Sequence, residues 1–181
     1  MPSAGTGTVD TNQLSKEFSV YRLIQDYRHK GHLIAQTNPI RSRKDRHANL
    51  DIKYFGLTDK DLTEKFQAGQ FIGLPGASLQ QIIDKLNKLY CSSVGVECSY
   101  VTDPEIYNWL IDAVEKKFLE VPTLEKRKRY LEKINQGVIF EKFLHTKYIG
   151  QKRFSLEGGE ALIPALDAII HEATNDAVEE A

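Results

Sequence analysis

The sequence predicts a mostly α-helical protein, and three observations support this fold class. Apolar residues recur at helical spacing through most of the 181 residues, and several of these segments begin with a residue that commonly caps helices. Only one short stretch alternates apolar and polar residues as a half-buried strand does. With 41% hydrophobic residues, the chain is long enough for one good core. We therefore expect a bundle of amphipathic helices that pack together through single apolar faces.

The composition argues against several classes of protein. The 24 basic and 25 acidic residues give a net charge of -1, which provides no overall field to attract nucleic acid or an anionic membrane. No apolar run approaches the roughly 20 residues that span a bilayer, and the N-terminus lacks the basic and apolar regions of a signal peptide. We expect a cytosolic protein, or one from a similarly reduced compartment, with neither nucleic acid nor a membrane as its partner.

Cys91 and Cys98 are the only cysteines. A lone close pair in a chain of this size is typical of buried thiols in a reducing compartment. No metal site is expected, since no second pair of Cys or His lies at the spacing of zinc ligands. Cys91 lies beside an apolar stripe with no nearby cation to lower its pKa, so we interpret it as a packing residue rather than a nucleophile.

The first segments are a tail and a long helix. Residues 1–11 are rich in Gly, Ser and Thr and are expected to form a flexible tail. A helix is predicted to begin between Asn12 and Lys16 and to end before Pro39. His32 falls near the end of this helix, and we interpret it as a hydrogen-bonded packing residue rather than a catalyst.

The only dense basic run follows this helix, between Arg41 and Arg46. A phosphate-binding patch would need aromatic residues or a partner helix to organise it, and the adjoining residues offer neither. The interpretation that we favour is a surface loop whose arginines pair with carboxylates elsewhere in the fold or on a partner.

Two short elements are predicted next. Residues 50–55 alternate apolar and polar side chains up to Gly56, which indicates a short strand or an extended connection. Thr58, followed by acidic residues, then predicts a helix that includes Phe66 and ends at Gly69.

Strong N-terminal signals mark the next two helices. Ser78 with Gln81 forms a capping box ahead of an apolar stripe that ends near Val94. Asp103 caps a helix in which Pro104 occupies the first position. Trp109 follows on the apolar stripe of that helix and is interpreted as a core residue rather than a platform for a ligand.

Thr123 caps a further helix, whose charged residues 125–129 are interpreted as a solvated face. Gly137 is expected to separate this helix from another helical segment that contains Phe140 and Phe143. Gly150 is expected to end the helical region.

Segment 152–160 comes last and is the most unusual in composition, with two bases, an aromatic, a hydroxyl and a carboxylate ahead of Gly158 and Gly159. The glycines precede a helical pattern, so they lie where unpaired N–H groups and the positive end of the helix dipole could hold an anion. Alternatively, they permit a turn with positive φ and close packing. We favour the turn, because an isolated Gly-Gly lacks the spaced glycines of a phosphate loop.

Several blocks of the sequence occur in an order typical of a known family. The blocks are Tyr21-Arg22-Leu23-Ile24, Tyr27-Arg28, Gly31-His32-Leu33, Asn38-Pro39-Ile40, Tyr90 to Glu97, Trp109-Leu110, Phe140 to Leu144 and Lys152 to Glu160. The agreement in chain order counts for more than any one motif. From about Phe18 to its end, the sequence resembles the N-terminal portion of the thiamine diphosphate-dependent 2-oxoglutarate dehydrogenases, the decarboxylating component of a multienzyme complex.

The resemblance implies a fold and an activity. A helical domain, here residues 12–150, would precede an α/β domain that binds thiamine diphosphate with Mg2+, of which residues 151–181 would be the truncated start. The implied reaction is oxidative decarboxylation of 2-oxoglutarate with transfer of the succinyl group to lipoyl in the tricarboxylic acid cycle. The implied partners are the rest of the polypeptide, a second copy in a homodimer, and a dihydrolipoyl succinyltransferase core. The implied location is the cytoplasm in bacteria or the mitochondrial matrix in eukaryotes.

The sequence ends before the family segments that handle the substrate carboxylates, hold the metal and activate the cofactor. No catalytic, cofactor-binding or metal-binding residue of the family therefore maps onto it, and we expect it to be inactive alone and to bind no cofactor. Lys152, Arg153, Ser155 and Glu157 remain as candidates for the edge of the site or for bracing. For Arg153 we favour bracing, through a pair with a nearby acid of the same segment.

A second hypothesis of another class is an autonomous helical interaction module. Its contact with a partner would be the basic loop between Arg41 and Arg46. Nucleic-acid binding through the same loop is a third and weaker option.

Overall fold

The computed structural model describes residues 11–44, 46–176 and 178–179. The tail expected at the N-terminus therefore lies outside the described residues, except for Thr11, which opens the first helix. The mostly helical fold class is confirmed, with 61% of residues in helix and 2% in strand. The chain divides into two compact units, Met1–Glu120 and Val121–Ala181. Each unit is described by itself.

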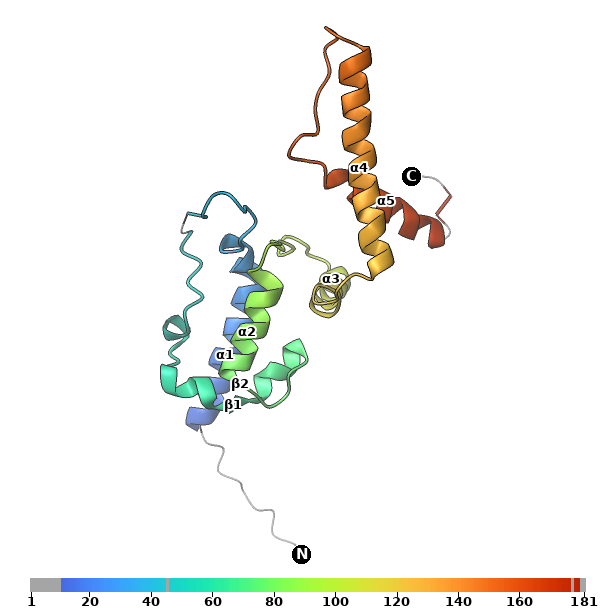
Figure 1. Ribbon diagram of the computed structural model, residues 1–181. Helices are drawn as coiled ribbons and strands as arrows, with labels where there is room; N and C mark the ends of the chain where they lie inside the picture. Colours follow the sequence, from blue (N-terminus) through green and yellow to red (C-terminus); the bar gives the residue numbers. More distant parts are fainter. Residues whose placement is uncertain (1–10, 45, 177, 180–181) are drawn as a thin grey trace, which may run out of the picture. The chain divides into compact units, whose positions relative to one another are not determined.

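The first unit is built on two helices, α1 (Thr11–Lys30) and α2 (Leu79–Tyr90), which lie side by side (Figure 1). Their facing side chains are fully or almost fully buried and form one apolar cluster. Burying an aliphatic side chain of this size stabilises a fold by about 1.5–3 kcal/mol. The buried residues of the pair are Val20, Leu23, Ile24 and Tyr27 on α1, with Leu79, Ile82, Leu86, Leu89 and Tyr90 on α2.

A glycine allows the ends of these two helices to meet. Gly31 opens the short 3-10 helix η1 (Gly31–Leu33) that continues α1. A Cβ atom at Gly31 would lie 2.6 Å from Tyr90 Cβ, closer than real Cβ contacts allow. The absence of a side chain at Gly31 therefore fixes how closely the two chain segments approach.

The prediction of a strand or extended connection at residues 50–55 is wrong. These residues form the 3-10 helix η2 (Ile52–Phe55), in which the Asp51 carboxylate accepts a hydrogen bond from Lys53 N at 2.8 Å. Gly56 ends the helix with φ 74°. The alternation of apolar and polar residues was misleading because a local side-chain cap competes with extended pairing.

The helix predicted from Thr58 starts as expected but is shorter. It is the 3-10 helix η3 (Asp59–Thr63), and its successor is a two-residue strand β1 (Lys65–Phe66) paired antiparallel with β2 (Ala77–Ser78). The 3-10 helix η4 (Gln67–Ile72) follows β1. Phe66 is fully buried in the core, and its extended backbone interrupts the expected helix.

The caps of the next two helices are confirmed. Ser78 Oγ accepts from Gln81 N at 3.3 Å at the start of α2, and Asp103 Oδ1 accepts from Glu105 N at 2.9 Å at the start of α3 (Pro104–Lys117). Trp109, expected in the core, is instead 67% exposed, and the buried residue of α3 is Ile111.

The second unit pairs α4 (Leu124–Lys147) with α5 (Leu162–Asn175). The break predicted at Gly137 is wrong, because α4 runs through it without interruption. A Cβ at Gly137 would lie 3.5 Å from Ile163 Cγ1, so this glycine lies where α4 contacts α5. Glycine lowers helix stability by only about 1 kcal/mol and keeps its N–H, unlike proline.

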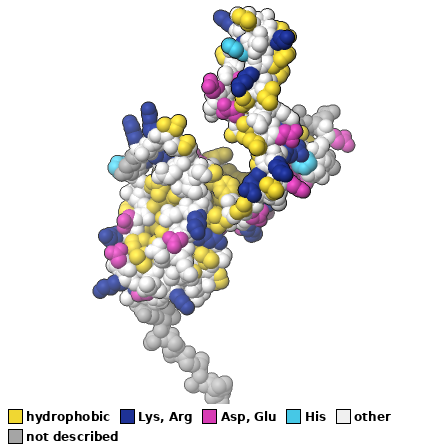
Figure 2. Space-filling view, viewed as in Figure 1, with side chains coloured by type: hydrophobic (Ala, Val, Ile, Leu, Met, Phe, Trp, Pro, Cys, Tyr) yellow, Lys and Arg dark blue, Asp and Glu magenta, His cyan; other side chains and the backbone are white. Residues whose placement is uncertain are grey.

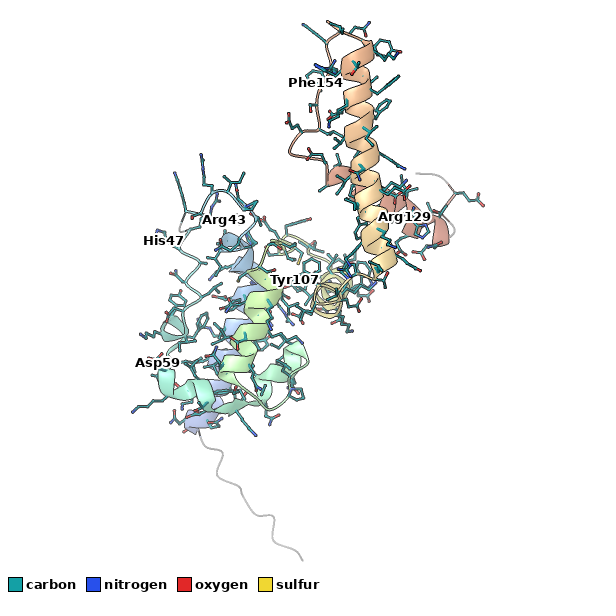
Figure 3. The ribbon with its side chains drawn as sticks, viewed as in Figure 1. Arg43, His47, Asp59, Tyr107, Arg129 and Phe154 are labelled. Carbon is teal, nitrogen blue, oxygen red and sulfur yellow. The ribbon has the colours of Figure 1, made fainter. Side chains whose placement is uncertain are left out.

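One arginine and one lysine of α4 hold α5 in place. Arg129 Nε donates to Asp167 Oδ2 at 2.6 Å, and Lys133 Nζ lies 3.1 Å from Asp167 Oδ1 (Figure 3). These two cations lower the pKa of Asp167 to about 2. Among the described residues of this unit only Pro164 is buried, so α4 and α5 leave most of their apolar side chains exposed.

Candidate functional site

Segment 152–160 is held against α4 by one carboxylate. Leu156 N donates to Glu141 Oε1 at 2.8 Å, and Ser155 Oγ donates to Glu141 Oε2 at 3.3 Å. Figure 1 shows the connection from α4 to α5 running back along α4. The two oxygens of the Glu141 side chain therefore position two neighbouring residues, Ser155 and Leu156.

Arg153 contacts α4 one turn further along. Its Nη2 atom lies within hydrogen-bonding distance of His145 Nδ1. No ion pair joins Arg153 to Glu157 or Glu160 in the described part of the chain. Between Arg153 and Ser155, the Phe154 side chain is fully exposed (Figure 3).

The glycine pair forms a turn ahead of α5. Gly158 has φ 87°, so the turn with positive φ that the sequence favours is present. Gly158 N donates to Glu160 Oε2 at 3.0 Å, and Glu157 N donates to Ser155 Oγ at 2.9 Å. These backbone N–H groups therefore already have acceptors within the segment and do not point to a vacant anion site.

The four predicted residues come together along the C-terminal half of α4. Lys152, Arg153 and Ser155 line a hollow of about 740 Å³ that includes His145. A neighbouring hollow is lined by Arg153, Ser155 and Glu157. The arrangement combines cations, a hydroxyl and carboxylates on one surface, which suits binding and orientation of charged groups.

Sequence reasoning missed the two residues that organise this surface, Glu141 and His145. They lie four residues apart on one helix, so they share a face of α4. That spacing was the available signal. It was not decisive, because charged residues at this spacing are common on solvated helix faces.

The structure contradicts the interpretation of His32 in part and agrees with that of Cys91. His32 Nδ1 is buried with no hydrogen-bond partner, and His32 Nε2 lies 3.9 Å from Glu97 Oε2, so the prediction of a hydrogen-bonded histidine is wrong for Nδ1. Burial raises the pKa of the Cys91 thiol to about 11, which agrees with a packing role rather than a nucleophilic one.

Comparison with known proteins gives consistent similarities. The chain is 41% identical over 168 residues to a multifunctional 2-oxoglutarate metabolism enzyme of Mycolicibacterium vanbaalenii, and this alignment covers 91% of the chain. It is 39% identical over 177 residues to a 2-oxoglutarate dehydrogenase E1/E2 component of Corynebacterium glutamicum, and 35% identical over 167 residues to an E1 component of Coxiella burnetii. No protein-family model matches the sequence.

The chain spans only 13% to 18% of the length of these relatives. It matches an N-terminal part of the 2-oxoglutarate dehydrogenase E1 component. The resemblance seen in the sequence is thereby confirmed, and it includes segment 152–160. In the described residues, no helix is both long and apolar enough to cross a membrane.

Proposed function

We propose that this chain is the N-terminal region of a 2-oxoglutarate dehydrogenase E1 polypeptide and serves it as a structural part. The observation that carries the proposal is a sequence identity of 35% to 41%, across more than 90% of the chain, to proteins named as 2-oxoglutarate dehydrogenase components or 2-oxoglutarate metabolism enzymes. The complete polypeptide would oxidatively decarboxylate 2-oxoglutarate and transfer the succinyl group to lipoyl in the tricarboxylic acid cycle. We place it in the cytoplasm of a bacterium or the matrix of a mitochondrion.

The domain arrangement belongs to the proposal. Residues 12–150 would form the helical domain and residues 151–181 the start of the cofactor-binding domain. The exposed apolar face of α5 supports an extensive contact beyond the described residues, since Ile169 and Ile170 are 63% and 66% exposed. The proposed partners are the rest of the polypeptide, a second copy and a dihydrolipoyl succinyltransferase core.

The proposed role of Lys152, Arg153, Ser155 and Glu157 is to form one edge of the enzyme's site. Thiamine diphosphate, when bound to the complete enzyme, supplies the electron sink that decarboxylation needs. Oxygen ligands would hold the accompanying Mg2+. The described residues contain no cluster of three His, Cys, Asp or Glu side chains that could hold a metal, and in this proposal the remainder of the polypeptide would supply the metal ligands. Glu141 and His145 would position the edge from α4.

Calorimetry on the chain and on the complete enzyme tests the proposal. We expect no Mg2+-dependent binding of thiamine diphosphate by the chain alone, because the ligands for metal and cofactor would come from the remainder of the polypeptide. The complete enzyme, titrated under the same conditions, is the control and should bind the cofactor saturably. Saturable Mg2+-dependent binding by the chain, or release of carbon dioxide from 2-oxoglutarate, would overturn the proposal.

A further inference from the structure

The loop after α1 forms a second polar surface, which the proposed function does not use. Its side chains line a hollow of about 300 Å³, here called the basic hollow. The lining residues are Gln36, Thr37, Asn38, Arg41, Ser42, Arg43, Lys44 and Arg46.

Local hydrogen bonds give the basic hollow a defined shape. Asn38 Oδ1 accepts from Ile40 N at 2.9 Å and from Arg41 N at 3.0 Å, which closes a turn. Arg43 Nη1 donates to Ala35 O at 3.0 Å, and this bond folds the loop back toward the end of α1. The loop is therefore organised by hydrogen bonds between its own side chains, Asn38 and Arg43, and backbone groups close to them in sequence, without a partner helix.

The charged side chains described as lining the basic hollow are all positive. None of the described lining residues is acidic, and the four Arg and Lys side chains are on exposed residues. Figure 2 shows dark blue side chains gathered over this loop, and Figure 3 labels Arg43 there. Asp45 is the one acid between Pro39 and His47, and it lies outside the described residues. Among the described residues, no carboxylate forms an ion pair with Arg41, Arg43 or Arg46, so pairing with a partner stays a prediction.

The chemistry of the basic hollow selects a class of ligand. Guanidinium and ammonium groups bind phosphate oxygens by charge-assisted hydrogen bonds, and Gln36 and Asn38 are amides whose N–H groups suit the same oxygens. The described residues that line the hollow include no aromatic side chain on which a nucleic-acid base could stack. A volume of about 300 Å³ is at the small end of ligand sites. We infer that the basic hollow binds a small anion with two or three linked phosphate groups.

Titration of the whole chain with inorganic tripolyphosphate, without metal, tests this inference. Binding should be saturable in the wild type. The combined variant Arg41→Gln, Lys44→Gln and Arg46→Gln should bind at least about tenfold more weakly, because each lost charge-assisted hydrogen bond contributes to affinity. Arg43 is left unchanged because it shapes the loop. Circular dichroism establishes that the variant is folded.

A matched control removes the same charge elsewhere. Lys126→Gln, Arg127→Gln and Lys128→Gln neutralise three exposed cations near the start of α4. This variant should bind tripolyphosphate as the wild type does. Absence of saturable binding, or equal weakening in both variants, would overturn the inference. Tighter binding of a glutamate-rich peptide than of tripolyphosphate would overturn it in favour of an acidic protein segment. Because this titration contains no Mg2+, its outcome is independent of the cofactor test.

Discussion

Asp61 shows how a single buried carboxylate organises the first unit. It accepts hydrogen bonds from Lys16 Nζ at 2.6 Å and from Thr58 N and Oγ1 at 2.6 and 2.8 Å. The hydrogen bond from Lys16 is the main cause that holds the pKa of Asp61 below its usual value, and the bonds from Thr58 act in the same direction. Asp61 thereby joins η3 to α1 across a large separation in sequence.

The stability that Asp61 provides should depend on pH. Because its pKa is lower in the folded state than in the unfolded state, its contribution is present above the unfolded value of about 3.9 and is lost as pH falls through the folded value. We expect Asp61→Asn to be less stable than the wild type in urea at pH 7, with the difference narrowing toward pH 3. Asp59→Asn, at an exposed acid of the same turn (Figure 3), is the control and should show little difference. A difference for Asp61→Asn that stays constant with pH would contradict this account.

At the scale of elements, α3 is joined to α1 and α2 by a partly buried ion pair. Glu115 accepts from Arg28 Nε at 2.8 Å and from Tyr90 Oη at 2.6 Å. Burial, followed by the bond to Glu115, raises the pKa of Tyr90, so its hydroxyl remains a donor. Arg28 Nη2 also donates to Phe71 O at 2.7 Å, which adds η4 to the same network.

Removing Glu115 should be costly because it leaves the partly buried Arg28 charge and the Tyr90 hydroxyl without their acceptor. We expect Glu115→Ala to lower the free energy of unfolding by about 2–4 kcal/mol, somewhat less than for a fully buried pair. Asp112→Ala is a matched control on the same helix, since it removes an exposed pair with Lys116 and should change that free energy by less than about 1 kcal/mol. Urea unfolding at pH 7 measures both. Similar small losses for the two variants would show that the buried network does not hold α3.

The elements also show where sequence patterns suffice. The caps at Ser78, Asp103 and Thr123 were predictable because a cap and its N–H partner lie within three residues. The strand pair β1–β2 was not, since each strand has two residues and their pairing joins distant positions. For the candidate site, the residues of segment 152–160 were found from composition and resemblance. Their contact with Glu141 could not be predicted, because it depends on how the chain turns back along α4 between Glu141 and Ser155.

At the scale of the whole molecule, the two units differ in how much apolar surface they bury. The first unit has a closed core between α1 and α2. In the described residues of the second unit, α4 has no buried residue and α5 has only Pro164. Large exposed apolar patches mark contact surfaces. The second unit therefore depends on contacts with other chain segments more than the first does.

Self-association of the chain tests this dependence. We expect its apparent mass to rise with concentration in analytical ultracentrifugation, because the apolar face of α5 would bury itself against another copy when nothing else covers it. Ile169→Ser with Ile170→Ser should weaken the association at least about tenfold, since each buried side chain contributes roughly 1.5–3 kcal/mol. Ile40→Ser, which also removes an exposed isoleucine, should leave it unchanged. A chain that stays monomeric at all concentrations would contradict the expectation.

The attachment of segment 152–160 to Glu141 constrains how this protein family can vary in length. Each residue of an α-helix turns the following side chains by about 100°. A one-residue insertion in α4 between Lys133 and Glu141 would rotate Glu141 and the segment bound to it relative to Arg129 and Lys133, which hold α5 through Asp167, so both attachments could not form as they do now. Insertions are therefore tolerable in the connection before α4, whereas the phase of this helix between its contacts with α5 and with segment 152–160 must be preserved.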